Sequence, residues 1–262
     1  MGFRNYFGNS LFLKSIRLAR SNPGKVGVMV LLDIMFVVSF FILQKLSVYL
    51  GGSIFSYQSV PVLAFLAVSL AYYLALLFLY TIFKYSMLGL VKSLFGKAKS
   101  SSGRFGMFYL LNMSIAAIFF AIMLALNFLL FSVKQPYARL VFIFLAVPYL
   151  LVLYIVLNLS HCIFYEGATI KNTLKSSFRI TFSKLGAYRE LILAMIVFAL
   201  LSWALLSGGG YLAGLLASKS NVSYLNVYGI FRQASIITID VLLYFIILLN
   251  RISFNSAARE SK

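Results

Sequence analysis

The sequence predicts an all-α polytopic membrane protein with six transmembrane helices, arranged as three two-span repeats in one transmembrane domain over residues 1–262. Three observations predict it. The chain is 62% hydrophobic and 11% charged, whereas a soluble domain carries about 25% charged residues. Several long stretches contain neither Lys nor Arg. A triplet of Lys or Arg, any residue and Gly recurs at nearly constant spacing.

The recurring triplets are Lys25-Val26-Gly27, Arg104-Phe105-Gly106 and Lys184-Leu185-Gly186, 79 and 80 residues apart. Each follows a basic, helix-like segment and precedes a long apolar run. This spacing predicts repeat units over 8–83, 88–165 and 167–252, each a basic interfacial helix followed by two spans. We expect the Gly of each triplet to supply the backbone freedom needed where the chain turns into the membrane.

The apolar runs are long enough to cross a bilayer, which requires about 20 residues. In chain order, the expected span cores are 26–43, 62–83, 107–131, 140–163, 190–207 and 233–250. The fifth core ends before Gly210 and Gly214. Their GxxxG spacing indicates either a helix-packing face or a loop or re-entrant turn beyond the span.

The basic residues predict the orientation of the spans. Of the 23 Lys and Arg residues, 18 lie at the two termini and in the segments after the second and fourth spans. Cytoplasmic loops carry such an excess, so we expect a cell-membrane protein with both termini in the cytoplasm. The first span would act as an uncleaved signal anchor.

The basic segments show amphipathic patterning. Ile170, Leu174, Phe178 and Phe182 recur at every fourth position beside a stripe of cations, and the earlier segments at 10–21 and 91–99 show weaker versions. Helices lying at the cytoplasmic interface, with cations among anionic headgroups, fit this pattern. The alternative is flanking charge without lipid selectivity. The candidate headgroup contacts are Lys14, Arg17, Lys92, Lys97, Lys99, Lys171, Lys175 and Arg179.

Two segments resemble a loosely defined group of prokaryotic integral membrane proteins. They are Glu166-Gly167 with Thr173-Leu174-Lys175-Ser176-Ser177-Phe178-Arg179-Ile180-Thr181, and Ser15-Ile16-Arg17-Leu18-Ala19-Arg20-Ser21-Asn22-Pro23. The group includes the membrane domain attached to some glycerophosphodiester phosphodiesterases. The resemblance implies a basic helix before each pair of spans, and it implies no catalytic residue.

Four polar side chains form the candidate intramembrane site. Asp240 and Asp33 lie inside expected spans, where ionisable residues are costly and often functional. Asn158 and His161 lie near the end of the fourth span. The alternative is structural, with each side chain bonded to a hydroxyl, an amide or a partner subunit. For Asp33, with Lys25 nearby in sequence, we expect the structural role.

The sequence contains no hydrolase, zinc-protease or phosphate-loop motif, and it predicts no catalytic, cofactor-binding or metal-binding residue. We therefore expect a non-enzymatic subunit or scaffold of a membrane assembly, or a protein that organises lipid. A membrane-protein partner or a second copy would accompany it, and nucleic acid would not. The alternative is a small-solute or ion transporter or channel that uses Asp240 and the His161 region.

The charge distribution makes a testable prediction about topology. With Cys162 changed to Ser, a single Cys introduced at Ser100 or Ser176 should be unreactive to an impermeant thiol reagent in intact cells. It should react once the membrane is opened. Labelling of either position from outside intact cells would overturn the predicted orientation.

Overall fold

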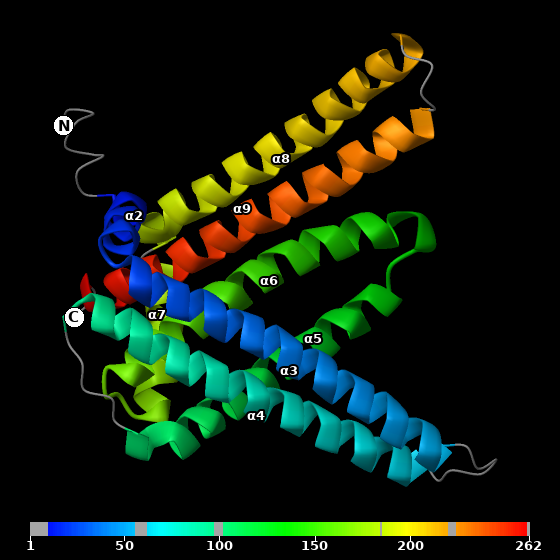
Figure 1. Ribbon diagram of the computed structural model, residues 1–262. Coiled ribbons are helices and arrows are strands. Elements are labelled where there is room, and N and C mark those ends of the chain that lie inside the picture. The colour runs from blue at the N-terminus through cyan, green and yellow to red at the C-terminus, as the bar shows by residue number, and fades with distance from the viewer. Residues whose placement is uncertain (1–9, 56–61, 97–101, 184, 220–223, 261–262) are drawn as a thin grey trace. The chain divides into compact units, whose positions relative to one another are not determined.

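The computed structural model is all-helical over the residues that it describes, which are 10–55, 62–96, 102–183, 185–219 and 224–260. Eight α-helices and one short 3₁₀-helix occur in this part of the chain (Figure 1). They are α2 (Leu11–Ser21), α3 (Pro23–Phe55), α4 (Val62–Leu94), η1 (Ser102–Arg104), α5 (Phe105–Phe131), α6 (Gln135–Tyr165), α7 (Ile170–Ser183), α8 (Leu185–Lys219) and α9 (Tyr224–Glu260).

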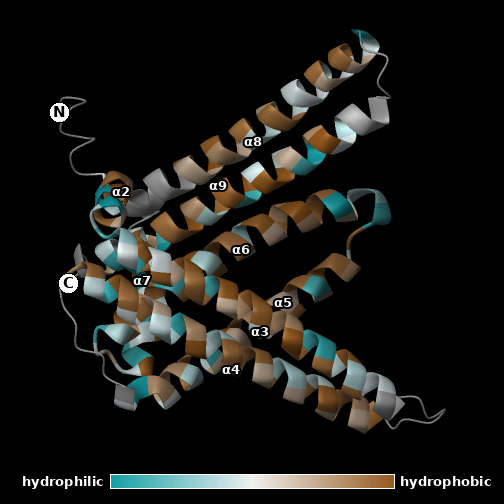
Figure 2. Cartoon of the chain, viewed as in Figure 1, coloured by the Kyte–Doolittle hydropathy of each residue, from teal (hydrophilic) through white to brown (hydrophobic). Residues whose placement is uncertain are grey.

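The six predicted spans are confirmed as six helices that are long and apolar enough to cross a membrane. They cover 27 to 33 residues each, or about 40–50 Å at 1.5 Å per residue, which exceeds a hydrocarbon core of about 30 Å. Their ends therefore extend into the headgroup region. Hydrophobic colouring predominates on α6 and on the coloured part of α8 in Figure 2. The span segments are Pro23–Gly52, Val62–Leu94, Phe105–Phe131, Gln135–Tyr165, Leu193–Lys219 and Tyr228–Ser256.

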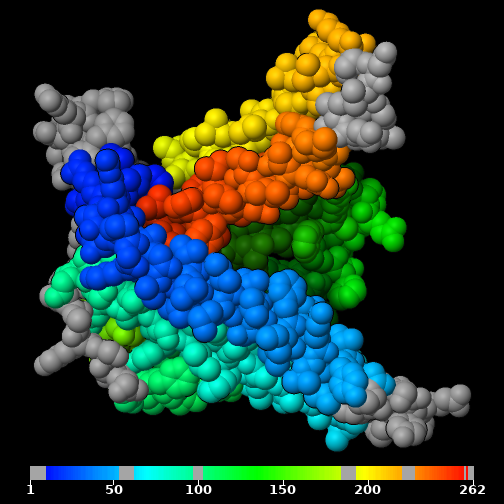
Figure 3. All heavy atoms as spheres, in the orientation of Figure 1, coloured from blue at the N-terminus to red at the C-terminus, as the bar shows by residue number. Residues whose placement is uncertain are grey.

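The chain divides into two compact units. The first contains residues 1–20 and 182–262, and thus α2, α8 and α9. The second contains residues 21–181, and thus α3 to α6 and most of α7. Within the units, α3 packs along α4 and α8 packs along α9 (Figure 3). In the second unit α4 also contacts α5 and α6. The single transmembrane domain over 1–262 stays a prediction.

The buried side chains of the second unit gather at one end of its helices. On α4 they begin at Thr81, on α5 they end at Phe119, and on α6 they lie between Ile155 and Phe164. The opposite ends are exposed, with Leu63 at 80% and Phe131 at 89%. The core therefore lies at the end that the charge distribution predicts to be cytoplasmic.

The second basic segment does not form a separate interfacial helix in its described part, so that prediction is wrong there. Val91 and Leu94 belong to α4, which runs unbroken to Leu94 and buries both side chains. Gly96 then ends the helix at a φ of 75°, a conformation that glycine adopts at little cost. The remaining predicted contacts of this segment, Lys97 and Lys99, lie outside the described residues.

The role predicted for the triplet glycines is also wrong. Gly27, Gly106 and Gly186 lie inside α3, α5 and α8, and the described glycines with positive φ are Gly96 and Gly167. Helix α3 instead begins at Pro23, a residue favoured at the first helical position because it needs no amide partner there.

The fifth span runs past its predicted end, since α8 continues to Lys219 and contains Gly208–Gly210 and Gly214. A loop or re-entrant turn at the GxxxG sequence is therefore excluded. The small residues do form a packing face, but its register differs. A Cβ at Gly209 would lie 2.2 Å from the Phe231 ring on α9, and Ala213, one turn later, is buried. Gly209 and Ala213 thus allow α8 and α9 to approach closely.

This packing makes Gly209→Leu destabilising, by about 1–3 kcal/mol for an overpacked contact. The matched control is Gly208→Leu, because nothing lies within 4 Å of a Cβ at Gly208. Thermal unfolding of the purified protein in detergent should show a lower Tm for the first variant only, with partial recovery in Gly209→Leu/Phe231→Ala. An equal effect of the two glycine substitutions would contradict this packing.

Candidate functional site

A chain of buried hydrogen bonds crosses three helices of the second unit. Asn112 of α5 donates from Nδ2 to Thr81 Oγ1 of α4 over 3.0 Å. His161 of α6 contacts Asn112 Oδ1 through Nε2 over 2.6 Å. Because an amide oxygen can only accept, His161 carries its proton on Nε2 and donates it.

The His161 side chain is completely enclosed. Its exposed fraction is 0%, and the rings of Phe108 and Tyr80 lie 5.0 and 6.1 Å from its own. Its Nδ1 atom has no hydrogen-bond partner among the described residues. His161 therefore joins the helices through one nitrogen and presents the other to an enclosed, aromatic environment.

A second polar link connects the same two outer helices one turn away. Lys84 of α4 donates to Asn158 Oδ1 of α6 over 3.1 Å, and Asn158 donates to the Tyr154 carbonyl over 2.8 Å. The structure thus brings the predicted residues Asn158 and His161 into one cluster. Sequence reasoning missed its other members, although Thr81 and Lys84 have the same spacing of three on α4 that Asn158 and His161 have on α6.

At the end of the unit, cations bind the terminal carbonyls of helices. Lys25 of α3 donates to the Ser93 carbonyl over 2.7 Å. Arg104 donates to the carbonyls of Phe164 and Ala168. Ser93 and Phe164 lie in the last turns of α4 and α6, where the carbonyls carry the negative end of the helix dipole, and Ala168 lies between α6 and α7. A charge-assisted hydrogen bond of this kind stabilises by about 1.5–3 kcal/mol.

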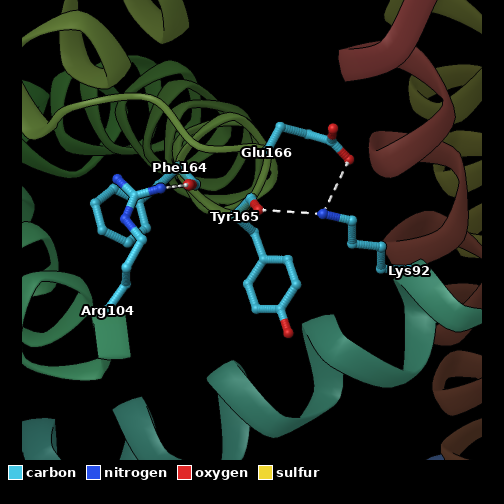
Figure 4. A network of polar contacts seen from close by, with 5 residues as sticks. All are labelled: Lys92, Arg104, Phe164, Tyr165 and Glu166. Carbon is cyan, nitrogen blue, oxygen red and sulfur yellow. Dashed lines mark hydrogen bonds and ion pairs between the residues drawn. The ribbon is translucent and has the colours of Figure 1, made fainter. Parts of the chain in front are cut away.

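Lys92 approaches the same helix end from α4 (Figure 4). Its Nζ lies 3.9 Å from Glu166 Oε1 and 3.5 Å from the Tyr165 carbonyl oxygen. Glu166 and His161, five residues apart, therefore engage different partners, Lys92 and Asn112.

The two intramembrane aspartates lie in different environments. Asp33 is half-buried on α3, and Asp240 is exposed on α9. No hydrogen bond or ion pair joins Asp240 to another described residue. Asp33 lies in the second unit with Asn158 and His161, whereas Asp240 lies in the first. Among the described residues, no three His, Cys, Asp or Glu side chains come together as metal ligands would.

The short basic helices contact the chain through hydroxyl groups. On α7 the buried residues are Thr173, Ser177 and Thr181, and Ser177 accepts a hydrogen bond from Ser160 of α6 over 2.8 Å. On α2, Ser15 Oγ lies 2.8 Å from Ser253 Oγ of α9. Sequence reasoning took the apolar stripe as the defining face of α7, and it missed these hydroxyl faces.

The predicted headgroup cations take several positions. Arg17 of α2 is exposed and Lys14 is half-buried. The cations of α7 point away from its buried hydroxyl face, and all of them are exposed: Lys171, Lys175 and Arg179.

No protein-family model, curated protein or solved structure matches this chain. The resemblance to prokaryotic membrane proteins with repeated two-span units therefore stays a prediction.

The buried cluster makes Asn112→Ala destabilising by about 1–3 kcal/mol, because it leaves His161 and Thr81 without their interhelical partner. Asn127→Ala is the matched control, since Asn127 is exposed on the same helix and donates to the Met123 carbonyl of its own helix. Denaturant unfolding in detergent should separate the two variants. Equal stability of both would show that the cluster does not hold the helices together.

Proposed function

We propose that this chain is a non-enzymatic subunit of a membrane assembly and that it docks on a partner membrane protein through α9. The observation that carries this proposal is the exposed carboxylate of Asp240. We place the protein in the cytoplasmic membrane with both termini inside, on the strength of its charge distribution.

Asp240 lies deep within its span. It follows Tyr228 by 12 residues and precedes Ser256 by 16 in the segment Tyr228–Ser256, which is about 18 and 24 Å along a helix. Its neighbours on the helix surface, Ile236, Ile237 and Leu243, are exposed and apolar. A charged side chain at such a depth costs about 2.5–3.5 kcal/mol. A cation, amide or hydroxyl from another helix removes much of that cost by pairing with it.

The docking partner is a different protein. Two copies related by a two-fold axis along the membrane normal would meet through the same surface, with both Asp240 carboxylates at one depth. Like charges in a site of low polarity oppose ionisation of both. A partner helix that carries a Lys, Arg or hydrogen-bond donor at this depth complements the carboxylate instead.

The structure supports transport less well. A transporter that uses Asp240 and the His161 region needs water-filled access to each side chain. His161 is fully buried, and neither the hollow lined by Tyr85 and Arg104 nor the one lined by Phe36 and Tyr80 includes His161 or Asp240. The cluster around His161 has the hydrogen bonding expected of a structural link between helices.

Photo-cross-linking in native membranes tests the subunit proposal. A photoreactive residue at Ile237, on the Asp240 face, should form an adduct with another membrane protein. The same residue at Leu242, on the opposite face of α9 and also exposed, should label lipid. Asp240→Leu should abolish the Ile237 adduct, whereas Asp240→Asn should retain it, because an amide still forms a hydrogen bond.

Equal labelling at both positions, or an Ile237 adduct only within the chain, would contradict docking on α9. Reconstituted proteoliposomes provide a separate control. Solute or ion flux that requires the Asp240 carboxylate would favour transport over the subunit function.

A further inference from the structure

A hollow of about 270 Å³ lies at the predicted cytoplasmic end of the second unit. It is lined by Tyr85 and Lys92 of α4, by Arg104, and by the chain from Phe164 to Gly167. Figure 4 shows Lys92 and Arg104 on opposite sides of the carboxyl end of α6. Two cations from different elements therefore converge on one small cavity. This site is independent of the α9 surface.

The ammonium group of Lys92 is held loosely. Its two polar contacts are 3.5 and 3.9 Å long, beyond the 2.7–2.9 Å of a strong charged hydrogen bond. It also lies 5.3 Å from the centre of the Tyr165 ring. The Lys92 side chain is 15% exposed, so its ammonium group is open to a ligand. An anion in the hollow could form a shorter contact with it.

The guanidinium group of Arg104 is held more firmly. It stacks 4.4 Å from the centre of the Phe164 ring and donates one hydrogen bond from each terminal nitrogen to a backbone carbonyl. A guanidinium has five N–H groups, so three remain for a ligand. The ring and the carbonyls fix the plane of the group and reduce the entropy lost on binding.

Two glycines shape the cavity. A Cβ at Gly89 of α4 would lie 3.0 Å from the Tyr165 hydroxyl, so glycine lets this ring lie close to α4. Gly167 has a φ of 109°, a conformation open to glycine and rare for other residues. It turns the chain directly after α6, between the two residues whose carbonyls bind Arg104.

We infer that this hollow binds a phosphate ester, with the Arg104 fork and the Lys92 ammonium group as its ligands. Arg presents paired donors that match phosphate oxygens, and Lys adds a point charge. The site carries one net positive charge from Lys92, Arg104 and Glu166. Because the spans extend beyond the hydrocarbon core, the cavity lies at the depth of lipid headgroups. An anionic phospholipid supplies this chemistry there, and a soluble phosphate ester is the other source.

The pocket should be more selective for one headgroup than the exposed cations of α7. Lys171, Lys175 and Arg179 are solvent-exposed, and they attract any anionic surface without selecting one headgroup. Lys92 and Arg104 are positioned by aromatic rings and carbonyls around a half-open hollow. Binding at the pocket should therefore depend on individual residues, whereas attraction to α7 should depend on total charge.

Native mass spectrometry of the full chain in neutral detergent, near 0.15 M ionic strength, tests this inference. The probe is dioctanoyl phosphatidylglycerol. Arg104→Gln should weaken its binding about tenfold, and Lys92→Gln should weaken it several-fold. The matched control Lys175→Gln removes one exposed cation outside the pocket. It should change binding less than about twofold, because salt screens the attraction between exposed charges that are more than about 8 Å apart.

Glu166→Gln tests the inference even if the Arg104 variant does not fold. Removal of the acid raises the net charge of the pocket and should tighten binding about fivefold. Unchanged or weaker binding in Glu166→Gln, or equal losses in Arg104→Gln and Lys175→Gln, would overturn the inference.

Competition separates the two sources of phosphate. If inorganic phosphate and glycerol 3-phosphate leave the lipid bound, the ligand is a headgroup in its membrane. If they displace it with the same dependence on Arg104, the ligand is a soluble phosphate ester. Dioctanoyl phosphatidylcholine, whose phosphate is neutralised by choline, should bind more weakly than phosphatidylglycerol.

Discussion

Cations that bind the carboxyl ends of helices close the two hairpins of the second unit. Lys25, at the start of α3, binds a carbonyl at the end of α4. Arg104, directly before α5, binds the Phe164 carbonyl in the last turn of α6 and the Ala168 carbonyl just beyond it. In each hairpin a cation at or directly before the start of the first helix thus supplies positive charge to the end of the second helix. Both cations belong to the recurring triplet. Lys184 of the third triplet lies outside the described residues.

The same end of the unit holds the buried polar links, Thr81–Asn112–His161 and Lys84–Asn158. In lipid, the apolar surfaces of helices gain little by leaving their solvent, because acyl chains are as apolar as Leu. Hydrogen bonds and close packing must therefore supply much of the association. Because these links are concentrated at one end, the side chains at the opposite ends of the helices, such as Leu63 and Phe131, are exposed.

The physics of the bilayer explains what the sequence predicted well. A chain with such long apolar runs must satisfy its backbone within helices, so the number of spans follows from composition. The extension of α8 through Gly208–Gly210 could not be predicted from composition, because glycine is a poor helix former in water and often lies at a helix end. Within a membrane span, the loss of backbone hydrogen bonds would cost more than the poor helix propensity of glycine, and the helix continues.

Only part of the candidate site could be predicted from the sequence. Asn158 and His161 were identified because they are polar residues within an apolar run, but one helix cannot reveal partners on another. The register of Gly209 and Ala213 likewise depends on Phe231 of α9. The buried face of α7 was missed because amphipathic reasoning assigns apolar residues to the interior. Here the Ser177 hydroxyl group bonds to Ser160 of α6, and a polar group in lipid gains from such a partner on another helix.

Asp240 differs from the other polar residues within the spans in the direction that its side chain faces. Thr81, Asn112 and His161 are turned inward and are paired by the chain itself. Asp240 is turned outward among Ile236, Ile237 and Leu243, and its carboxylate has no partner among the described residues. This exposed carboxylate at mid-span is the reason why we propose a partner for this face of α9. A helix of another membrane protein is the partner that can reach this depth without leaving its own backbone groups unsatisfied.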